Sequence, residues 1–261
     1  MSIIQHRRII LQSCSGFSNT SESKSIRKLN MICDDITLVE CTLSELHKHI
    51  DFLKTGAIPV GSVKFVNTVM ELLEIQLPQF YTLNCTDIPR HFYGRQISTV
   101  NKSDVIKLPG YFIKPIEIKQ FSGFIYRGSD VENYHTEYER EQFQQFQQLS
   151  MDVKLFQSEI VDILAEWRCY IHRGILIKTC QYDDGVDDRV LCSTFIDSVL
   201  EYLKGETLAL DIGLLSNGKY VIIELNDAYA IGKYKELSDD AYLDFISTRW
   251  NEIFYYGGYS I

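Results

Sequence analysis

The chain has 261 residues, of which 45% are hydrophobic and 23% are charged, and its formal net charge is −9. This composition is typical of a globular protein, and the acidic balance argues against broad binding to nucleic acid or to a membrane surface, both of which favour a basic face. Seven scattered cysteines without a Cys-x-x-Cys pair indicate neither a disulfide framework nor a zinc site, and no apolar run approaches the roughly 20 residues that span a membrane. We therefore expect a cytoplasmic protein.

The first third of the chain is predicted to be a small α/β domain over residues 1–96. Apolar runs predict strands at 9–11 and 37–39. Residues 15–29 are rich in Ser, Lys and Asn, and we expect them to form a loop. Alternating strands and helices in this region favour helices packed on a sheet.

Two helices are predicted in the same third. Thr42 and Glu45 match the capping box, in which each side chain accepts a hydrogen bond from a backbone amide at the helix start. The helix that they open has apolar residues at helical spacing and ends before Gly56. A second helix is predicted after Ser62.

The character of the sequence changes near residue 97, and we expect a second unit over residues 97–157. Three strands are predicted in its first half, at residues 105–108, 111–114 and 123–127. The polar segment 128–150 is expected to be a mobile connection that ends in a short helix, because Phe143, Phe146 and Leu149 stand at helical spacing.

A third unit is expected over residues 158–261. Three strands are predicted around its start, at residues 154–161, 167–171 and 175–180. Helices are predicted from Ser193 to Gly205 and after Ser238, where Asp239 begins an acidic first turn. Together the three units predict an α+β fold with antiparallel strands.

A β-hairpin is the strongest local signal in the chain. Asn217-Gly218 lies between two apolar runs, which predicts a tight hairpin over residues 208–227. With a two-residue turn, Ser216 lies opposite Lys219. The same register, continued outward, decides which residues face each other farther along the strands.

That register places Asp211 directly opposite Glu224. Side chains alternate between faces along a strand, so Asn226 shares the face of Glu224. Carboxylates about 5 Å apart repel each other, and a divalent cation would remove that repulsion. Oxygen ligands of this kind suit Mg²⁺, which takes one or two carboxylates and leaves the rest of its shell to water and phosphate. We therefore predict Asp211, Glu224 and Asn226 as metal ligands.

Two features that suit a nucleotide come before the hairpin. Lys114 ends an apolar strand just before Pro115, and Lys119 follows; a lysine on a rigid strand can hold a phosphate as a compact positive charge. A later strand-like run has backbone groups that could bind an adenine edge and a carboxylate that could accept from ribose hydroxyls. Its residues are Gln157, Ser158, Glu159, Ile160 and Val161.

A third feature is an arginine within a strand. Arg168 alternates with apolar neighbours, so it points away from the face that they occupy. Its guanidinium suits a phosphate or a developing oxyanion. A structural ion pair with Glu166 or Glu159 is the alternative.

The sequence lacks several common catalytic motifs. No Gly-rich Walker loop and no Gly-x-Gly-x-x-Gly occur, which excludes P-loop and Rossmann nucleotide binding. Gly-x-Ser-x-Gly is absent as well, and the six histidines show no metal-ligand spacing.

In chain order, the lysine before proline, the 157–161 strand, the Arg168 strand and the hairpin ending in Glu224-x-Asn226 resemble the ATP-grasp superfamily, in particular glutathione synthetase-like carboxylate–amine ligases. The resemblance covers roughly residues 105–235. It implies an ATP-grasp fold, in which two antiparallel-sheet subdomains clasp ATP behind the small N-terminal domain.

The same resemblance implies roles for the predicted site residues. Lys114 and Lys119 would hold the α- and β-phosphates of ATP, and the 157–161 strand would bind adenine and ribose. The three predicted metal ligands would hold Mg²⁺ between the β- and γ-phosphates. Arg168 would stabilise the oxyanion of a tetrahedral intermediate.

The implied reaction is an ADP-forming ligation. A small-molecule or peptide carboxylate would become an acyl phosphate and would then be transferred to an amine, in a protein whose default assembly is a homodimer. Two alternatives stay open, a nucleotide-binding protein without catalysis and a purely structural domain. A third is a hydrolase that uses Asp211 and Glu224, since carboxylates about 5 Å apart fit a retaining glycosidase.

Overall fold

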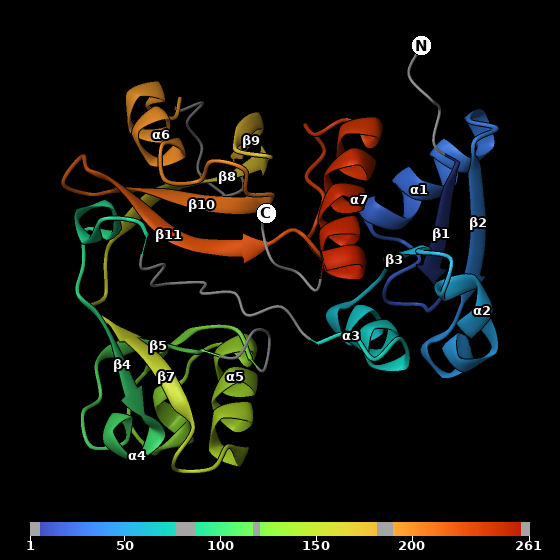
Figure 1. The fold of residues 1–261 in the computed structure, drawn as a ribbon. Helices are drawn as coiled ribbons and strands as arrows, with labels where there is room; N and C mark the ends of the chain where they lie inside the picture. The colour runs from blue at the N-terminus through green and yellow to red at the C-terminus, as the bar shows by residue number, and fades with distance from the viewer. Residues whose placement is uncertain (1–5, 77–86, 117–120, 182–189, 257–261) are drawn as a thin grey trace.

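The strands form three sheets, as Figure 1 shows for a computed structural model that describes residues 6–76, 87–116, 121–181 and 190–256. The N-terminal sheet is parallel, with the order β2-β1-β3. Its strands are β1 (Arg7–Gln12), β2 (Ile36–Cys41) and β3 (Ile58–Val60). The predicted strands at 9–11 and 37–39 are therefore confirmed.

The predicted loop at 15–29 is wrong, because most of it belongs to helix α1 (Ser21–Ile32). Thr20 caps this helix by accepting a hydrogen bond from the backbone amide of Ser23 at 3.3 Å. Only a narrow apolar stripe, with Ile26 and Leu29 at its centre, packs into the core. Such a polar helix depends on tertiary packing rather than on a strong sequence pattern.

The capping box at Thr42 is confirmed, although it opens a 3₁₀ helix, η1 (Leu43–His49), that continues as α2 (Ile50–Leu53). Helix α3 (Val63–Leu72) begins after Ser62, whose Oγ accepts from the backbone amide of Phe65. α3 thus starts at the end of β3.

The second sheet is antiparallel, with the order β4-β7-β5-β6. Its strands are β4 (Ile97–Asn101), β5 (Tyr111–Pro115), β6 (Phe124–Tyr126) and β7 (Lys154–Ser158). Helix α5 (Glu137–Gln148) packs on it through Phe143 and Phe146, and two short helices, η2 (Arg90–Tyr93) and η3 (Val131–Asn133), flank it in sequence.

The predicted strand at 105–108 is wrong, because helix α4 (Lys102–Val105) precedes a turn there and the strand lies earlier, at β4. The cause is tertiary. The ammonium of Lys102, only 3% exposed, donates to the carbonyls of Gln147 and Leu149 and ties α4 to the end of α5. A lysine in this role has no local sequence signature.

The third sheet is also antiparallel, with the order β11-β10-β8-β9. Its strands are β8 (Ile163–His172), β9 (Ile175–Gln181), β10 (Leu208–Leu215) and β11 (Tyr220–Asp227). Helix α6 (Ser193–Leu200) covers one face through Ile196 and Val199. Its N-cap is Cys192 rather than the predicted Ser193.

Helix α7 (Asp239–Tyr256) lies between the third sheet and the N-terminal sheet (Figure 1). Its predicted buried face is confirmed, and it shares one hydrophobic core with β1, β3 and α3. The C-terminal helix thus joins the first and last parts of the chain. Within the described ranges, none of the helices is both long and apolar enough to cross a membrane.

Candidate active site

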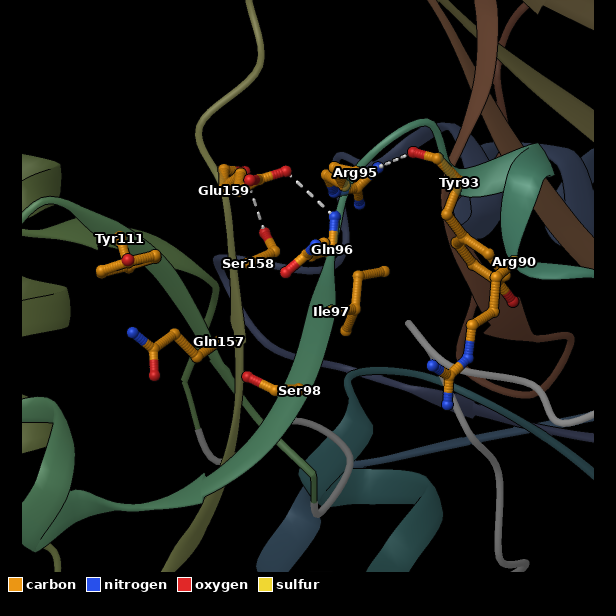
Figure 2. A pocket seen from close by; sticks show the side chains of 10 residues that line it. All are labelled: Arg90, Tyr93, Arg95, Gln96, Ile97, Ser98, Tyr111, Gln157, Ser158 and Glu159. Carbon is orange, nitrogen blue, oxygen red and sulfur yellow. Dashed lines mark hydrogen bonds between the residues drawn. The ribbon is translucent and has the colours of Figure 1, made fainter.

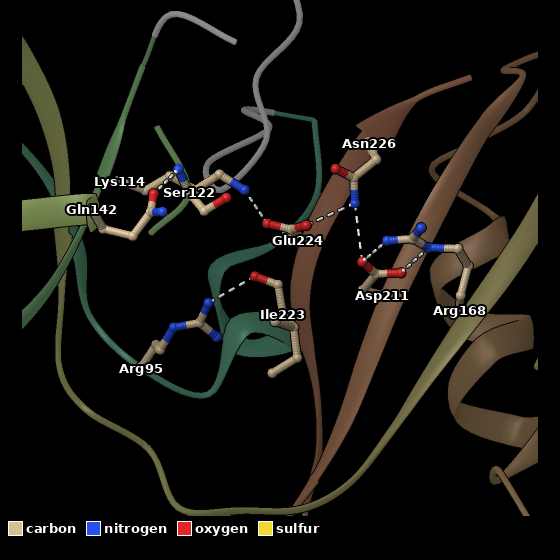
Figure 3. A network of polar contacts seen from close by, with 9 residues as sticks. All are labelled: Arg95, Lys114, Ser122, Gln142, Arg168, Asp211, Ile223, Glu224 and Asn226. Carbon is tan, nitrogen blue, oxygen red and sulfur yellow. Dashed lines mark hydrogen bonds and ion pairs between the residues drawn. The ribbon is translucent and has the colours of Figure 1, made fainter. Parts of the chain in front are cut away.

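Three neighbouring strands bring three charged residues side by side. Asp211 on β10 is the cross-strand partner of Arg168 on β8 and of Glu224 on β11. All three side chains lie on one face of the sheet, together with Asn226 (Figure 3). The predicted opposition of Asp211 and Glu224 is therefore confirmed.

The turn that leads to this register differs from the prediction. Leu215, not Ser216, pairs with Lys219, because its amide donates to the Lys219 carbonyl at 2.9 Å. The loop has three residues and ends at Gly218, whose φ of 80° suits glycine. A β-bulge at Ile223 then adds one residue to β11 and restores the predicted opposition.

Asp211 and Arg168 form a two-pronged ion pair. Arg168 donates from Nε to Oδ1 at 2.8 Å and from Nη2 to Oδ2 at 2.7 Å. The partner of Arg168 is thus neither Glu166 nor Glu159 in this contact. Asn226 links the two carboxylates, because its Nδ2 donates to Asp211 at 3.0 Å and to Glu224 at 2.9 Å.

Lys114 reaches this group from the second sheet. It lies on β5, and its ammonium donates to Oε2 of Glu224 (Figure 3). The polar network therefore runs from one antiparallel sheet to the other. Alternating positive and negative groups along it compensate each other's burial, since both Lys114 and Glu224 are mostly buried.

Burial shifts the two carboxylates in different ways. It raises the pKa of Asp211 to about 6, although Arg168 opposes this effect, and the Asp211 side chain is 1% exposed. Burial also acts to raise the pKa of Glu224, but Lys114 and Asn226 outweigh it and lower that pKa. Above neutral pH both groups are anionic, as metal ligands must be.

Arg95 is a site residue that sequence reasoning missed. Its guanidinium donates to the carbonyls of Ile222 and Ile223, both at 2.8 Å, and so supports the β11 bulge next to Glu224 (Figure 3). A single arginine in a polar segment gives no signal of this role. Only the fold brings it to the hairpin.

A cleft of about 670 Å³ opens over the network. Lys114, Arg168, Glu224 and Asn226 all line it. A smaller cavity of about 130 Å³ adjoins the cleft at Phe112, Ile223 and Glu224, and its lining is mainly apolar. This pairing of an apolar cavity with a charged cleft can hold a flat apolar ring system joined to an anionic chain.

The predicted adenine strand divides between two places. Four of its residues, Ser158, Glu159, Ile160 and Val161, line the small apolar cavity, in the connection that follows β7. Gln157 lines a different cavity of about 700 Å³ (Figure 2). The carboxylate of Glu159 accepts from the backbone amide of Gln96 at 3.1 Å, so it already has a protein partner.

The predicted phosphate ligand Lys119 lies outside the described residues. The segment that follows it is tied to α5, because the amide of Ser122 donates to Oε1 of Gln142 at 2.7 Å (Figure 3). Both residues line the cleft, as does Tyr138 on the same helix. Part of the predicted lid, residues 128–150, thus borders the site.

The donor set was tested against a magnesium ion. Among the described residues, no group of three or more His, Cys, Asp and Glu side chains is arranged to hold a metal. Two carboxylates and one amide do converge, however, at the edge of a cleft that can hold a phosphate chain. Mg²⁺ takes few protein ligands when phosphates complete its shell, so these residues fit the ion.

Comparisons with known proteins agree with this geometry. A family model described as an ATP-grasp domain, the second family of its clade, matches residues 92–245. The structure of D-alanine–D-alanine ligase from Bacillus anthracis complexed with ATP has a TM-score of 0.51 at 16% identity, covers 95% of this chain and 97% of its own, and shows the fold alone.

Other solved structures resemble the chain more weakly. The RimK domain ATP-grasp protein from Sphaerobacter thermophilus has a TM-score of 0.46 at 11% identity, with 92% and 98% of the two chains covered. Macrocyclase MdnC from Microcystis aeruginosa, bound with precursor peptide MdnA, has the same values. The comparison with curated proteins gave no match.

Proposed function

Since this chain belongs to the ATP-grasp domains, in the family whose model matches residues 92–245, we propose that it is an ATP- and Mg²⁺-dependent ligase that joins a carboxylate to an amine and forms ADP. One observation carries the proposal. A continuous polar network, from Lys114 through Glu224, Asn226 and Asp211 to Arg168, spans two antiparallel sheets along a cleft large enough for a nucleotide.

The nucleotide is proposed to lie across both cavities. Adenine would occupy the apolar cavity against Ile160 and Val161, and the phosphates would extend into the cleft toward Lys114. Lys119 remains a second proposed phosphate ligand. The three sequence units, 1–96, 97–157 and 158–261, are proposed to supply the substrate side, one half of the ATP clasp and the other half.

Asp211, Glu224 and Asn226 are the proposed metal ligands. When bound there, Mg²⁺ would supply charge neutralisation at the β- and γ-phosphates. Before nucleotide binds, Lys114 and Arg168 hold the two carboxylates apart from each other's charge. Rotation of the Asn226 amide would present its oxygen in place of Nδ2.

In the proposed reaction, a substrate carboxylate oxygen attacks the γ-phosphorus and the bond to the ADP oxygen breaks. An amine then attacks the resulting acyl carbon, loses a proton and displaces phosphate. Lys114 would bind the phosphate chain, and Arg168, which lines the cleft, would stabilise the oxyanion of the tetrahedral intermediate. The surrounding cleft would exclude water from the acyl phosphate.

A thermal-shift titration with ATP and ADP, with and without Mg²⁺, tests the nucleotide and metal assignments. Ligand at about 100 times its dissociation constant stabilises the native state by roughly 2.7 kcal/mol. We expect a Mg²⁺-dependent shift in the wild type that is lost in Glu224→Gln. ADP release with panels of acids and amines then separates a ligase from a protein that only binds nucleotide.

The hydrolase alternative has less support. Arg168 occupies both oxygens of Asp211, and that side chain is 1% exposed, so it cannot attack a sugar carbon in this arrangement. A retaining glycosidase needs one free, accessible carboxylate as nucleophile. Absence of any nucleotide-dependent shift would overturn the ligase proposal.

A further inference from the structure

A second cavity adjoins the cleft on the side of the N-terminal sheet. It has a volume of about 340 Å³ and lies where α3, α7 and the segment after β11 meet (Figure 1). It shares a wall with the cleft, formed by Val63, Ala230 and Ile231. A molecule held there would therefore border the space proposed for the γ-phosphate.

The lining of this cavity is mainly apolar and aromatic, with Phe17, Tyr229, Tyr242 and Trp250 among its residues. Trp250 is 1% exposed, and its Nε1 has no hydrogen-bond partner among the described residues. A buried indole N–H normally has a partner. An acceptor on a bound molecule would supply one.

The loop that forms the shared wall is held in a strained shape. Ala230 has a φ of 48°, which is unfavourable for a residue with a Cβ. Tyr242 donates to the carbonyl of Ile231 at 3.0 Å, and Tyr170 donates to the carbonyl of Gly232 at 2.7 Å. Side chains from two other elements thus fix the wall, as expected where a ligand must be positioned.

Charge at the wall favours an acid. The ten-residue helix α3 begins at Val63, so its N-terminus, which attracts anions, opens beside the wall. Arg168 lines the cleft on the other side of that wall. The one carboxylate in the cavity lining, Glu22, is engaged by the backbone amide of Lys233 at 2.5 Å.

We infer that this cavity holds the side chain of the acid that the ligase activates, and that the acid bears a bulky, preferably aromatic group with a hydrogen-bond acceptor facing Trp250. This inference rests on the proposed function for the word activates, but not for binding. The acid's carboxylate would lie at the shared wall, between the start of α3 and Arg168.

Calorimetric titration without nucleotide tests the binding directly, with acetate, phenylpropionate and pyridylpropionate as probes above neutral pH. Burial of an aromatic ring predicts that the two larger acids bind at least about tenfold more tightly than acetate. Trp250→Phe should weaken pyridylpropionate about fivefold and leave phenylpropionate unchanged, since only the nitrogen acceptor uses the indole N–H. Trp167→Phe, at the other tryptophan, is the matched control.

Ile246→Phe narrows the cavity from α7 and lies outside the cleft lining. We expect it to abolish the advantage of both aromatic acids over acetate, in a protein whose thermal unfolding shows that it is folded. Aromatic acids that bind no better than acetate, or as well in folded Ile246→Phe, would overturn the inference. Acids that bind in the cavity but never promote ADP release from ATP support the cavity and count against the ligase.

Discussion

Arg168 and Asp211 face each other on neighbouring strands, and the guanidinium donates to both carboxylate oxygens, at 2.8 and 2.7 Å. Asp211 is 1% exposed, so its charge depends on this partner. A planar guanidinium matches a carboxylate in this way, whereas an ammonium acts as a point charge. The same guanidinium lines the cleft, where the proposed reaction develops an oxyanion.

Arg168→Lys separates these two roles. The lysine keeps a positive charge near Asp211, so we expect a folded protein that still binds ATP. It cannot place donors on Asp211 and on the oxyanion together, and ADP formation should fall about 10²- to 10³-fold. Arg168→Met is the contrasting variant, which leaves a buried charge unpaired and should lose about 3–5 kcal/mol of unfolding free energy. A fully active lysine variant would contradict the proposed role.

Arg95→Met tests whether the β11 bulge is held from outside the hairpin. The variant removes the donors to the carbonyls of Ile222 and Ile223, and unsatisfied buried acceptors cost about 1–3 kcal/mol. Because the bulge sets the position of Glu224, Mg²⁺-dependent ATP binding should weaken about tenfold, by thermal-shift titration. Arg90→Met, at an exposed arginine nearby, is the control and should change neither quantity.

The hairpin shows how far sequence reasoning reaches in this chain. Strand alternation and the Asn217-Gly218 pair were enough to place Asp211 opposite Glu224. The turn itself was predicted one residue too short, and the bulge at Ile223 compensated for that error. Bulges of this kind depend on a distant donor, here Arg95, so no local pattern announces them.

The ATP-grasp fold was predictable because its motifs stand in a fixed order along the chain, and the family match at residues 92–245 confirms it. The contact of Lys114 with Glu224 was not predictable from register, since the two residues lie on different sheets. Helix α1 was missed because its buried stripe is narrow. The roles of the site residues stay predictions.

Asp227 and Arg249 form a second buried pair, just beyond Asn226. Arg249 donates from Nε and Nη2 to the two oxygens of Asp227, at 2.7 and 2.6 Å, and so fastens the end of β11 to α7. Arg249→Met should lower the unfolding free energy by about 3–5 kcal/mol, in urea titrations followed by circular dichroism.

The matched control for that variant removes both charges. Asp227→Leu with Arg249→Met leaves no unpaired buried ion, and replacing a buried pair by apolar residues is often nearly neutral. The double variant should therefore recover most of the lost stability. Equal destabilisation of the single and double variants would show that packing, rather than the ion pair, holds this junction.

Asp239 links α7 to α1 and gives the chain a pH-dependent contact. Its carboxylate accepts from Ser25 at 2.6 Å and from Lys28 at 2.7 Å, and Lys233 lies 3.2 Å away. Hydrogen bonds from Lys28 and Ser25 lower its pKa to about 2. Folding therefore favours the ionised form, and the contribution is complete above the unfolded-state pKa of about 3.9 and lost as the pH falls toward 2.

Between pH 6 and pH 3, the wild type should lose about 1 kcal/mol more unfolding free energy than Asp239→Asn, whose amide does not titrate; this figure allows for solvent screening. Asp240→Asn removes the same charge from the same helical turn at an exposed position, so it should follow the wild type. Urea titrations at several pH values measure the difference. Parallel curves for the wild type and Asp239→Asn would mean that the Lys28 contact contributes nothing in solution, and that α1 is held to α7 by its apolar stripe alone.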